Sequence, residues 1–139
     1  MANQELVSLL IPGLDALLPE GVPKASQILL SGTVGTGKTV FGLQYVYNAC
    51  TIAKENALFA TFEEHTFELR AQARRLGWNL EELEKENKLL IKRYDPFVID
   101  EVLSVLENDL KRIGATRVVI HTTSNFTIYL KDLADIRRT

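Results

Sequence analysis

The sequence has little that would support disulfide, metal or membrane chemistry. It has a single cysteine, Cys50, so no disulfide can form within the chain. Its only histidines are His65 and His121, and two lone histidines do not predict a transition-metal site. No apolar run approaches the roughly 18 residues of a membrane-spanning helix, and Met1 to Leu10 lack the basic start and cleavage site of a signal peptide. We therefore expect a soluble, cytoplasmic protein that does not bind a membrane.

The sequence also lacks a large excess of positive or negative charge. Sixteen Lys and Arg residues stand against eighteen Asp and Glu residues, which leaves a formal net charge of -2. No global positive field attracts nucleic acid, so nucleic-acid binding is not expected. The local basic run Arg70, Arg74 and Arg75 is typical of the solvated face of a helix.

What the sequence does contain is an alternation of buried-type strands and helices. The length of 139 residues and the hydrophobic content of 46% predict that residues 1–139 form a single domain with a hydrophobic core. Short apolar runs without polar alternation predict strands, and helical patterns separate them. The result is an α/β three-layer sandwich, with a mainly parallel sheet and helices on both faces. The predicted strands are 27–31, 57–62, 89–94 and 117–121, and the predicted helices are 38–53, 67–76, a short one capped by Asn79, and 96–113.

The stretch SGTVGTGKTV joins the first strand to the first helix and matches a phosphate-binding loop in full. Glycines let successive backbone N–H groups point inward at phosphate oxygens, and the helix N-terminus adds positive potential. The lysine would reach the β and γ phosphates, and the threonine after it would ligate Mg²⁺. The residues predicted to bind nucleotide are Gly32, Thr33, Val34, Gly35, Thr36, Gly37, Lys38, Thr39 and Val40, with Thr39 as the metal ligand.

An acidic pair, Glu63 and Glu64, follows the second predicted strand. In parallel sheets ligands bind beyond the carboxyl ends of the strands, so a carboxylate there could orient a water or accept its proton. By spacing alone, two exposed acids that begin a helix and favour its dipole fit the pattern as well.

Three segments together resemble the KaiC-like ATPases of the RecA superfamily. They are IPGLDALLPEGVPKASQILLSGTVGTGKTVFGLQYVYNA, then ALFATFEE, then RRLGWNLEELEKENKLLI, and the resemblance covers nearly the whole chain in the same order. It implies a P-loop NTPase fold of the RecA type, ATP and Mg²⁺ as ligands, and ATP hydrolysis to ADP and phosphate. It also implies that Glu63 and Glu64 are catalytic, because the family's paired glutamates activate the hydrolytic water.

Two departures from the family pattern bear on activity. The family's later strand ends in Asp-Ser, whose Asp holds Mg²⁺ through water, whereas RVVIHTTSNF places His121 and Thr122 there. An imidazole is a poor partner for Mg²⁺, which prefers hard oxygen ligands. We expect slow or lost hydrolysis, with His121 hydrogen-bonded to Thr122, Thr123 or solvent.

The second departure is the shortness of the chain after this strand. In RecA-like folds the strand between the phosphate-loop strand and the Asp strand comes later in the sequence. We therefore expect a truncated domain that lacks the C-terminal strands, with 27–31 paired directly to 117–121 because unpaired buried backbone groups are costly. Exposed strand edges favour a homo-oligomer or a protein partner.

The leading hypothesis is an ATP- and ADP-binding KaiC-like protein with weak or lost ATPase activity, in which Glu63 is the base and Glu64 assists. The alternative is a nucleotide-sensing or partner-binding module without catalysis. A DNA-recombination ATPase is the least favoured, because the chain is acidic and lacks an aromatic and basic stripe.

Overall fold

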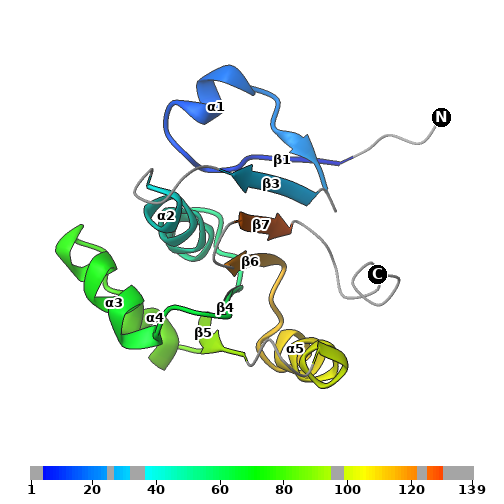
Figure 1. Cartoon of the computed structure of the whole chain (residues 1–139). Helices are drawn as coiled ribbons and strands as arrows, with labels where there is room; N and C mark the ends of the chain where they lie inside the picture. Colours follow the sequence, from blue (N-terminus) through cyan, green and yellow to red (C-terminus); the bar gives the residue numbers. More distant parts are fainter. Residues whose placement is uncertain (1–4, 25–26, 32–36, 95–98, 122–124, 130–139) are drawn as a thin grey trace.

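The computed structural model describes residues 5–24, 27–31, 37–94, 99–121 and 125–129, and alternates strands with helices as the sequence predicts (Figure 1). Its elements are β1 (Leu6–Val7), α1 (Leu14–Leu17), β2 (Val22–Pro23), β3 (Gln27–Ser31), α2 (Lys38–Thr51), β4 (Ala57–Thr61), α3 (Thr66–Arg75), α4 (Leu80–Lys85), β5 (Leu89–Arg93), α5 (Ile99–Ile113), β6 (Arg117–His121) and β7 (Asn125–Tyr129).

The main sheet has five strands in the order β3-β7-β6-β4-β5. Strand β4 pairs in parallel with both β5 and β6, and β7 pairs antiparallel with both β6 and β3. Since β7 alone runs against the others, the prediction of a mainly parallel sheet is confirmed.

The predicted direct pairing of 27–31 with 117–121 is wrong. Strand β7, which the sequence analysis did not predict, lies between them, with Ser31 opposite Asn125 on one side and His121 opposite Phe126 on the other. Only three residues separate β6 from β7, so the chain can turn back and pair locally with the strand it has just formed. The gap is therefore filled by a strand from nearby sequence. The segment 131–138, which could continue as a helix, lies outside the described residues.

Helices cover both faces of the sheet (Figure 1). Strand β4 is buried along its whole length, and its side chains alternate between two cores. Ala57 and Phe59 pack with α2, α3 and α4, while Leu58 and Ala60 pack with α5. The layered α/β prediction is confirmed by this alternation.

Local signals place the helix ends. The side chain of Asn79 accepts a hydrogen bond from the backbone N–H of Glu82 at 3.3 Å, which is the predicted N-cap of α4. Gly114 has a positive φ of 68° just after α5, as expected of a terminating glycine. Asp95 and Pro96, predicted to start that helix, lie outside the described residues. Within the described residues, no helix is long and apolar enough to cross a membrane.

Arg117 ties the amino end of β6 to distant parts of the chain. Its side chain is 3% exposed, donates to the Ser8 carbonyl at 2.7 Å, and pairs with Glu55 at 3.0 Å. The guanidinium also lies 5.6 Å from the centre of the Tyr45 ring. This cluster joins the segment after β1 to the sheet and to α2, and it stands at the edge opposite His121.

One helix offers a matched test of the packing. Leu106 on α5 is 4% exposed, whereas Leu103 on the same helix is 50% exposed. We expect Leu106→Ala to lower the free energy of unfolding by about 2 to 4 kcal/mol, because it leaves a cavity against Leu58 and Val118. Leu103→Ala makes the same change in helix propensity and is expected to cost less than about 0.5 kcal/mol. Urea unfolding followed by circular dichroism measures both, and equal losses would contradict the core assignment.

Candidate functional site

The carboxyl ends of the parallel strands meet at one edge of the sheet. Thr61 at the end of β4 lies opposite His121 at the end of β6, and His121 lies opposite Phe126 of β7. Ser31 at the end of β3 lies opposite Asn125, the residue beside Phe126. The loop after Ser31 and the acidic pair after Thr61 therefore leave the sheet from the same edge, where ligands bind in this architecture.

Helix α2 begins at this edge with an N-terminus that no described side chain caps. Gly37 is the N-cap residue and has a left-handed φ of 87°, a conformation that favours glycine. The first turn of α2 contains no acidic residue. Exposed N–H groups and the positive end of the helix dipole make such a terminus suited to an anion.

The predicted nucleotide residues are only partly described. Gly32, Thr33, Val34, Gly35 and Thr36 lie outside the described residues. Lys38 is the first residue of α2. Thr39 is half-buried and Val40 is exposed in the first turn.

The acidic pair lies in a turn ahead of α3, so the two acids do not form the first turn of that helix. Helix α3 begins at Thr66 with His65 as its N-cap, and Glu68 is the acid in its first turn. The buried Thr61 hydroxyl shapes the turn, because it donates to the Glu64 carbonyl at 3.1 Å and accepts from the Glu63 N–H at 3.3 Å. The backbone of the pair is thus held against the end of β4.

The two carboxylates have different surroundings. Glu63 is exposed, whereas Glu64 is half-buried and its Oε2 is covered. Among the described residues, Oε2 accepts no hydrogen bond, but it lies 3.7 Å from His121 Nε2. Burial is the largest cause that raises the pKa of Glu64 above its ordinary value, and the nearby Glu68 adds to the rise. A hydrogen bond from Gln72 acts in the opposite direction.

The contact between His121 and Glu64 is one that the sequence analysis missed. It expected Thr122, Thr123 or solvent as partners of His121, and both threonines lie outside the described residues. The imidazole is 12% exposed and its edge packs on Phe59, with ring centres 6.3 Å apart and planes at 71°. The register of β4 with β6 was the missing information, because spacing along the chain does not reveal which residues face each other.

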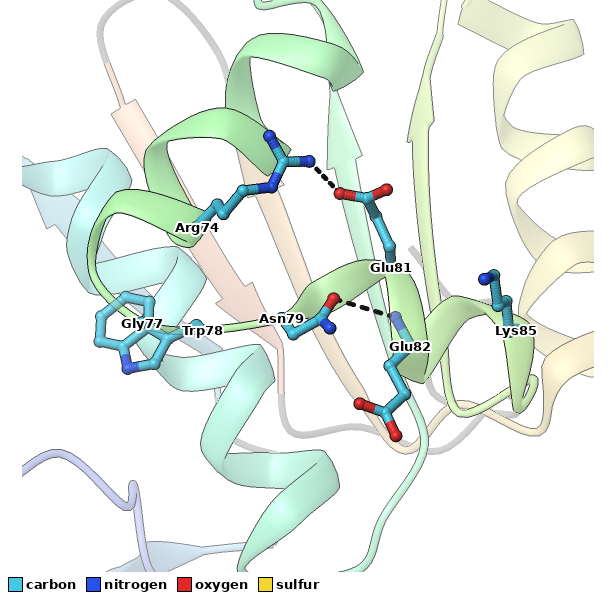
Figure 2. Close-up of a pocket in the computed structure, with 7 residues that line it drawn as sticks. All are labelled: Arg74, Gly77, Trp78, Asn79, Glu81, Glu82 and Lys85. Atoms are coloured by element: carbon cyan, nitrogen blue, oxygen red, sulfur yellow. Dashed lines mark hydrogen bonds and ion pairs between the residues drawn. The ribbon is translucent and has the colours of Figure 1, made fainter.

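A hollow lies between the end of α3 and α4, away from the edge described above (Figure 2). It has a volume of about 730 Å³, and the Arg74 and Glu81 side chains in its lining form an ion pair with each other. Trp78 at its rim stacks on Tyr47 of α2, with ring centres 5.8 Å apart, so this ring packs α2 against the end of α3. The hollow lies at the end of α3 far from the acidic pair.

These features define a class before any comparison is made. An open sheet with helices on both faces, a glycine loop that leads into a helix, and acids at the carboxyl edge describe a RecA-type α/β domain.

Comparison with known proteins narrows this class to a family. The sequence matches the family described as "ATPase: KaiC" over residues 7–139, so the chain belongs to the KaiC ATPase family. A UPF0273 protein of Methanocaldococcus jannaschii is 32% identical across 93% of this chain and 60% of its own length. The circadian clock oscillator protein KaiC of Thermosynechococcus vestitus is 32% identical across 88% of this chain and 26% of its own length.

A solved structure agrees with the family assignment. The crystal structure of a KaiC-like protein from Pyrococcus horikoshii superposes with a TM-score of 0.75 at 33% identity, covering 85% of this chain and 53% of that one. The RecA-type fold prediction is confirmed. This chain spans little more than half of the archaeal relatives that it matches.

The raised pKa of Glu64 predicts a pH-dependent stability. A carboxyl group whose pKa is higher in the folded state than in the unfolded state stabilises the fold at low pH. This stabilisation is lost as the pH rises above 4.5, the ordinary pKa of the group. Glu64→Gln removes that loss, so the free energy of unfolding of the variant should rise relative to the parent as the pH rises above 4.5.

Denaturant unfolding at a series of pH values measures this difference. Glu63→Gln removes the same charge from an exposed position and is the matched control. A Glu64→Gln variant that loses stability relative to the parent on going from acid to neutral pH would contradict the burial argument.

Proposed function

We propose that this chain binds Mg-ATP at residues 32–40 as a single nucleotide-binding domain, and that it hydrolyses ATP slowly or not at all. The observation that carries the proposal is that β3, which precedes α2, and β4, which precedes the acidic pair, end at the same edge of the sheet as β6, whose last residue is His121. Membership of the KaiC ATPase family supports nucleotide as the ligand class.

The start of α2 fits a phosphate group. A Cβ built on Gly37 meets nothing within 4 Å, so the space beside this residue is open, while its left-handed φ keeps a glycine there. Backbone N–H groups of the loop and of the first turn would hold the β and γ phosphates. Lys38 would add a point charge to the same oxygens.

The same edge of the sheet has fewer groups that could bind a metal ion than groups that could bind phosphate. The Thr39 hydroxyl is a hard oxygen ligand and suits Mg²⁺, which keeps several of its waters and binds phosphate oxygens. When bound, Mg²⁺ would neutralise part of the negative charge of the phosphates. No group of three or more His, Cys, Asp or Glu residues within the described ranges could hold a metal by itself. His121 is no substitute for a carboxylate that binds the metal's waters.

Water activation falls to Glu63 in this proposal. Its side chain is exposed just beyond the carboxyl end of β4, where it would orient a water or accept the proton of one. Glu64 is held back by burial and by His121, so it assists and does not itself abstract the proton. In this proposal only one carboxylate of the pair is exposed, and β6 ends in His121 and not in an acidic residue. Turnover would therefore be slow.

The second candidate is a module that binds nucleotide without hydrolysing it. The contact of His121 with Glu64 favours it, because that contact occupies one of the two carboxylates. A homo-oligomer or a protein partner fits either candidate, since β3 and β5 are the edge strands of the described sheet. A role on DNA gains no support from Arg70 and Arg74 of α3, because Arg70 donates two hydrogen bonds of 2.8 Å to Glu84 and Arg74 pairs with Glu81.

Replacing Lys38 tests the binding site. Lys38→Ala should weaken Mg-ATP binding by about 10- to 100-fold, because a charged hydrogen bond to phosphate is lost. Isothermal titration calorimetry of the intact chain measures the change. Lys85→Ala on α4 removes a lysine at a distance from this edge and should bind as the parent does. Full affinity in the Lys38 variant would overturn the site assignment.

Replacing the acidic pair separates the two candidate functions. A Glu63→Gln, Glu64→Gln double variant should retain Mg-ATP binding and release ADP only at the background rate. Release of ADP by the parent above that rate supports the slow ATPase. Equal background rates in both proteins would leave the non-catalytic module as the function.

A further inference from the structure

We propose that His121 is a positioning residue that holds the Glu64 carboxylate against the end of β6 and so leaves Glu63 as the acid that faces the ligand. This inference rests on the proposed function for its catalytic meaning, but the contact itself can be tested without nucleotide. It assigns a role to the imidazole that stands where an acidic residue would otherwise serve the metal.

The backbone brings the two residues together before any side chain is considered. Thr61 and His121 are register partners in the parallel pair of β4 and β6. One residue further, the Phe62 N–H donates to the His121 carbonyl at 3.1 Å, so the pairing continues to the last residue of β6. The Thr61 hydroxyl then turns the chain by accepting from the Glu63 N–H and donating to the Glu64 carbonyl. The turn returns Glu64 to the end of β6.

The side chains complete the contact in a covered space. Glu64 Oε2 lies 3.7 Å from His121 Nε2, and no hydrogen bond from the described residues reaches this oxygen. The Phe59 ring packs against the imidazole, with ring centres 6.3 Å apart. A carboxylate oxygen that is covered and lacks a hydrogen bond is unfavourable unless a positive charge or a donor lies near it. The His121 imidazole lies 3.7 Å from this oxygen and carries a positive charge when it is protonated.

The other groups around Glu64 do not serve this purpose. On α3, Glu68 is of like charge and raises the pKa of Glu64, while Gln72 donates a hydrogen bond but carries no charge. Glu63 and His65 flank it in the chain, and both are exposed. Among the described elements packed against Glu64, β6 supplies a side chain, His121, that carries a compensating positive charge when it is protonated.

Reciprocal titration in the nucleotide-free protein tests the contact. If the two groups interact, His121→Gln should raise the pKa of Glu64 further, and Glu64→Gln should shift the His121 titration to lower pH by the same amount. Carboxyl ¹³C shifts of labelled glutamate and imidazole ¹⁵N shifts report the two groups separately. A residue that only fills space would not couple the two titrations.

The design includes a matched control and a second measurement. His65→Gln removes the neighbouring exposed imidazole and should leave the Glu64 titration in place. If His121→Gln does not fold, the Glu64→Gln arm still reads the coupling from the histidine side. Unchanged titration of both partners would overturn the inference.

Mg-ATP calorimetry on the same proteins distinguishes this failure from failure of the proposed function. Uncoupled titrations in a protein that binds Mg-ATP overturn the positioning role alone. Coupled titrations in a protein that shows no binding heat overturn the proposed function, and with it the catalytic meaning of the contact.

Discussion

The pairing of β4 with β5 and β6 is the constraint on which the rest of this structure depends. Strand β4 is buried along its whole length, so its backbone groups need partners on both sides, and it has them. Its alternating side chains join the two cores, one under α2, α3 and α4 and the other under α5. The same strand ends in Thr61, whose hydroxyl shapes the turn that carries the acidic pair. Packing and candidate chemistry therefore share one element.

The acidic pair shows how one turn can place two identical residues in different environments. Glu63 is exposed and Glu64 is partly covered, although they are adjacent in the chain. Neighbouring titratable groups whose surroundings differ in this way can take separate roles in proton transfer. At the end of β6, His121 Nε2 lies 3.7 Å from the covered oxygen of Glu64.

Strand β7 gives the sheet an arrangement that family resemblance alone would not suggest. It lies antiparallel between β3 and β6, in the place where direct pairing was expected. The segment Asn125–Tyr129 reads NFTIY, in which Phe126 and Ile128 alternate with polar Thr127. This pattern is typical of a strand and was the available signal. The chain thus keeps β3 attached to the sheet while spanning only about half of its archaeal relatives.

The sequence by itself determined the α/β class, the strands at 27–31 and 117–121, the start of α2 at Lys38 and the cap of α4 at Asn79. These features depend on neighbouring residues, since hydrophobic pattern, glycine loops and capping side chains all act locally. Only the tertiary structure decided the place of β7 in the sheet, the bonds of Arg117 to Ser8 and Glu55, and the contact of His121 with Glu64. The partners in each case lie far apart in the sequence or on different strands and turns, so the folding of the whole chain, and not the spacing of neighbouring residues, determines which of them meet.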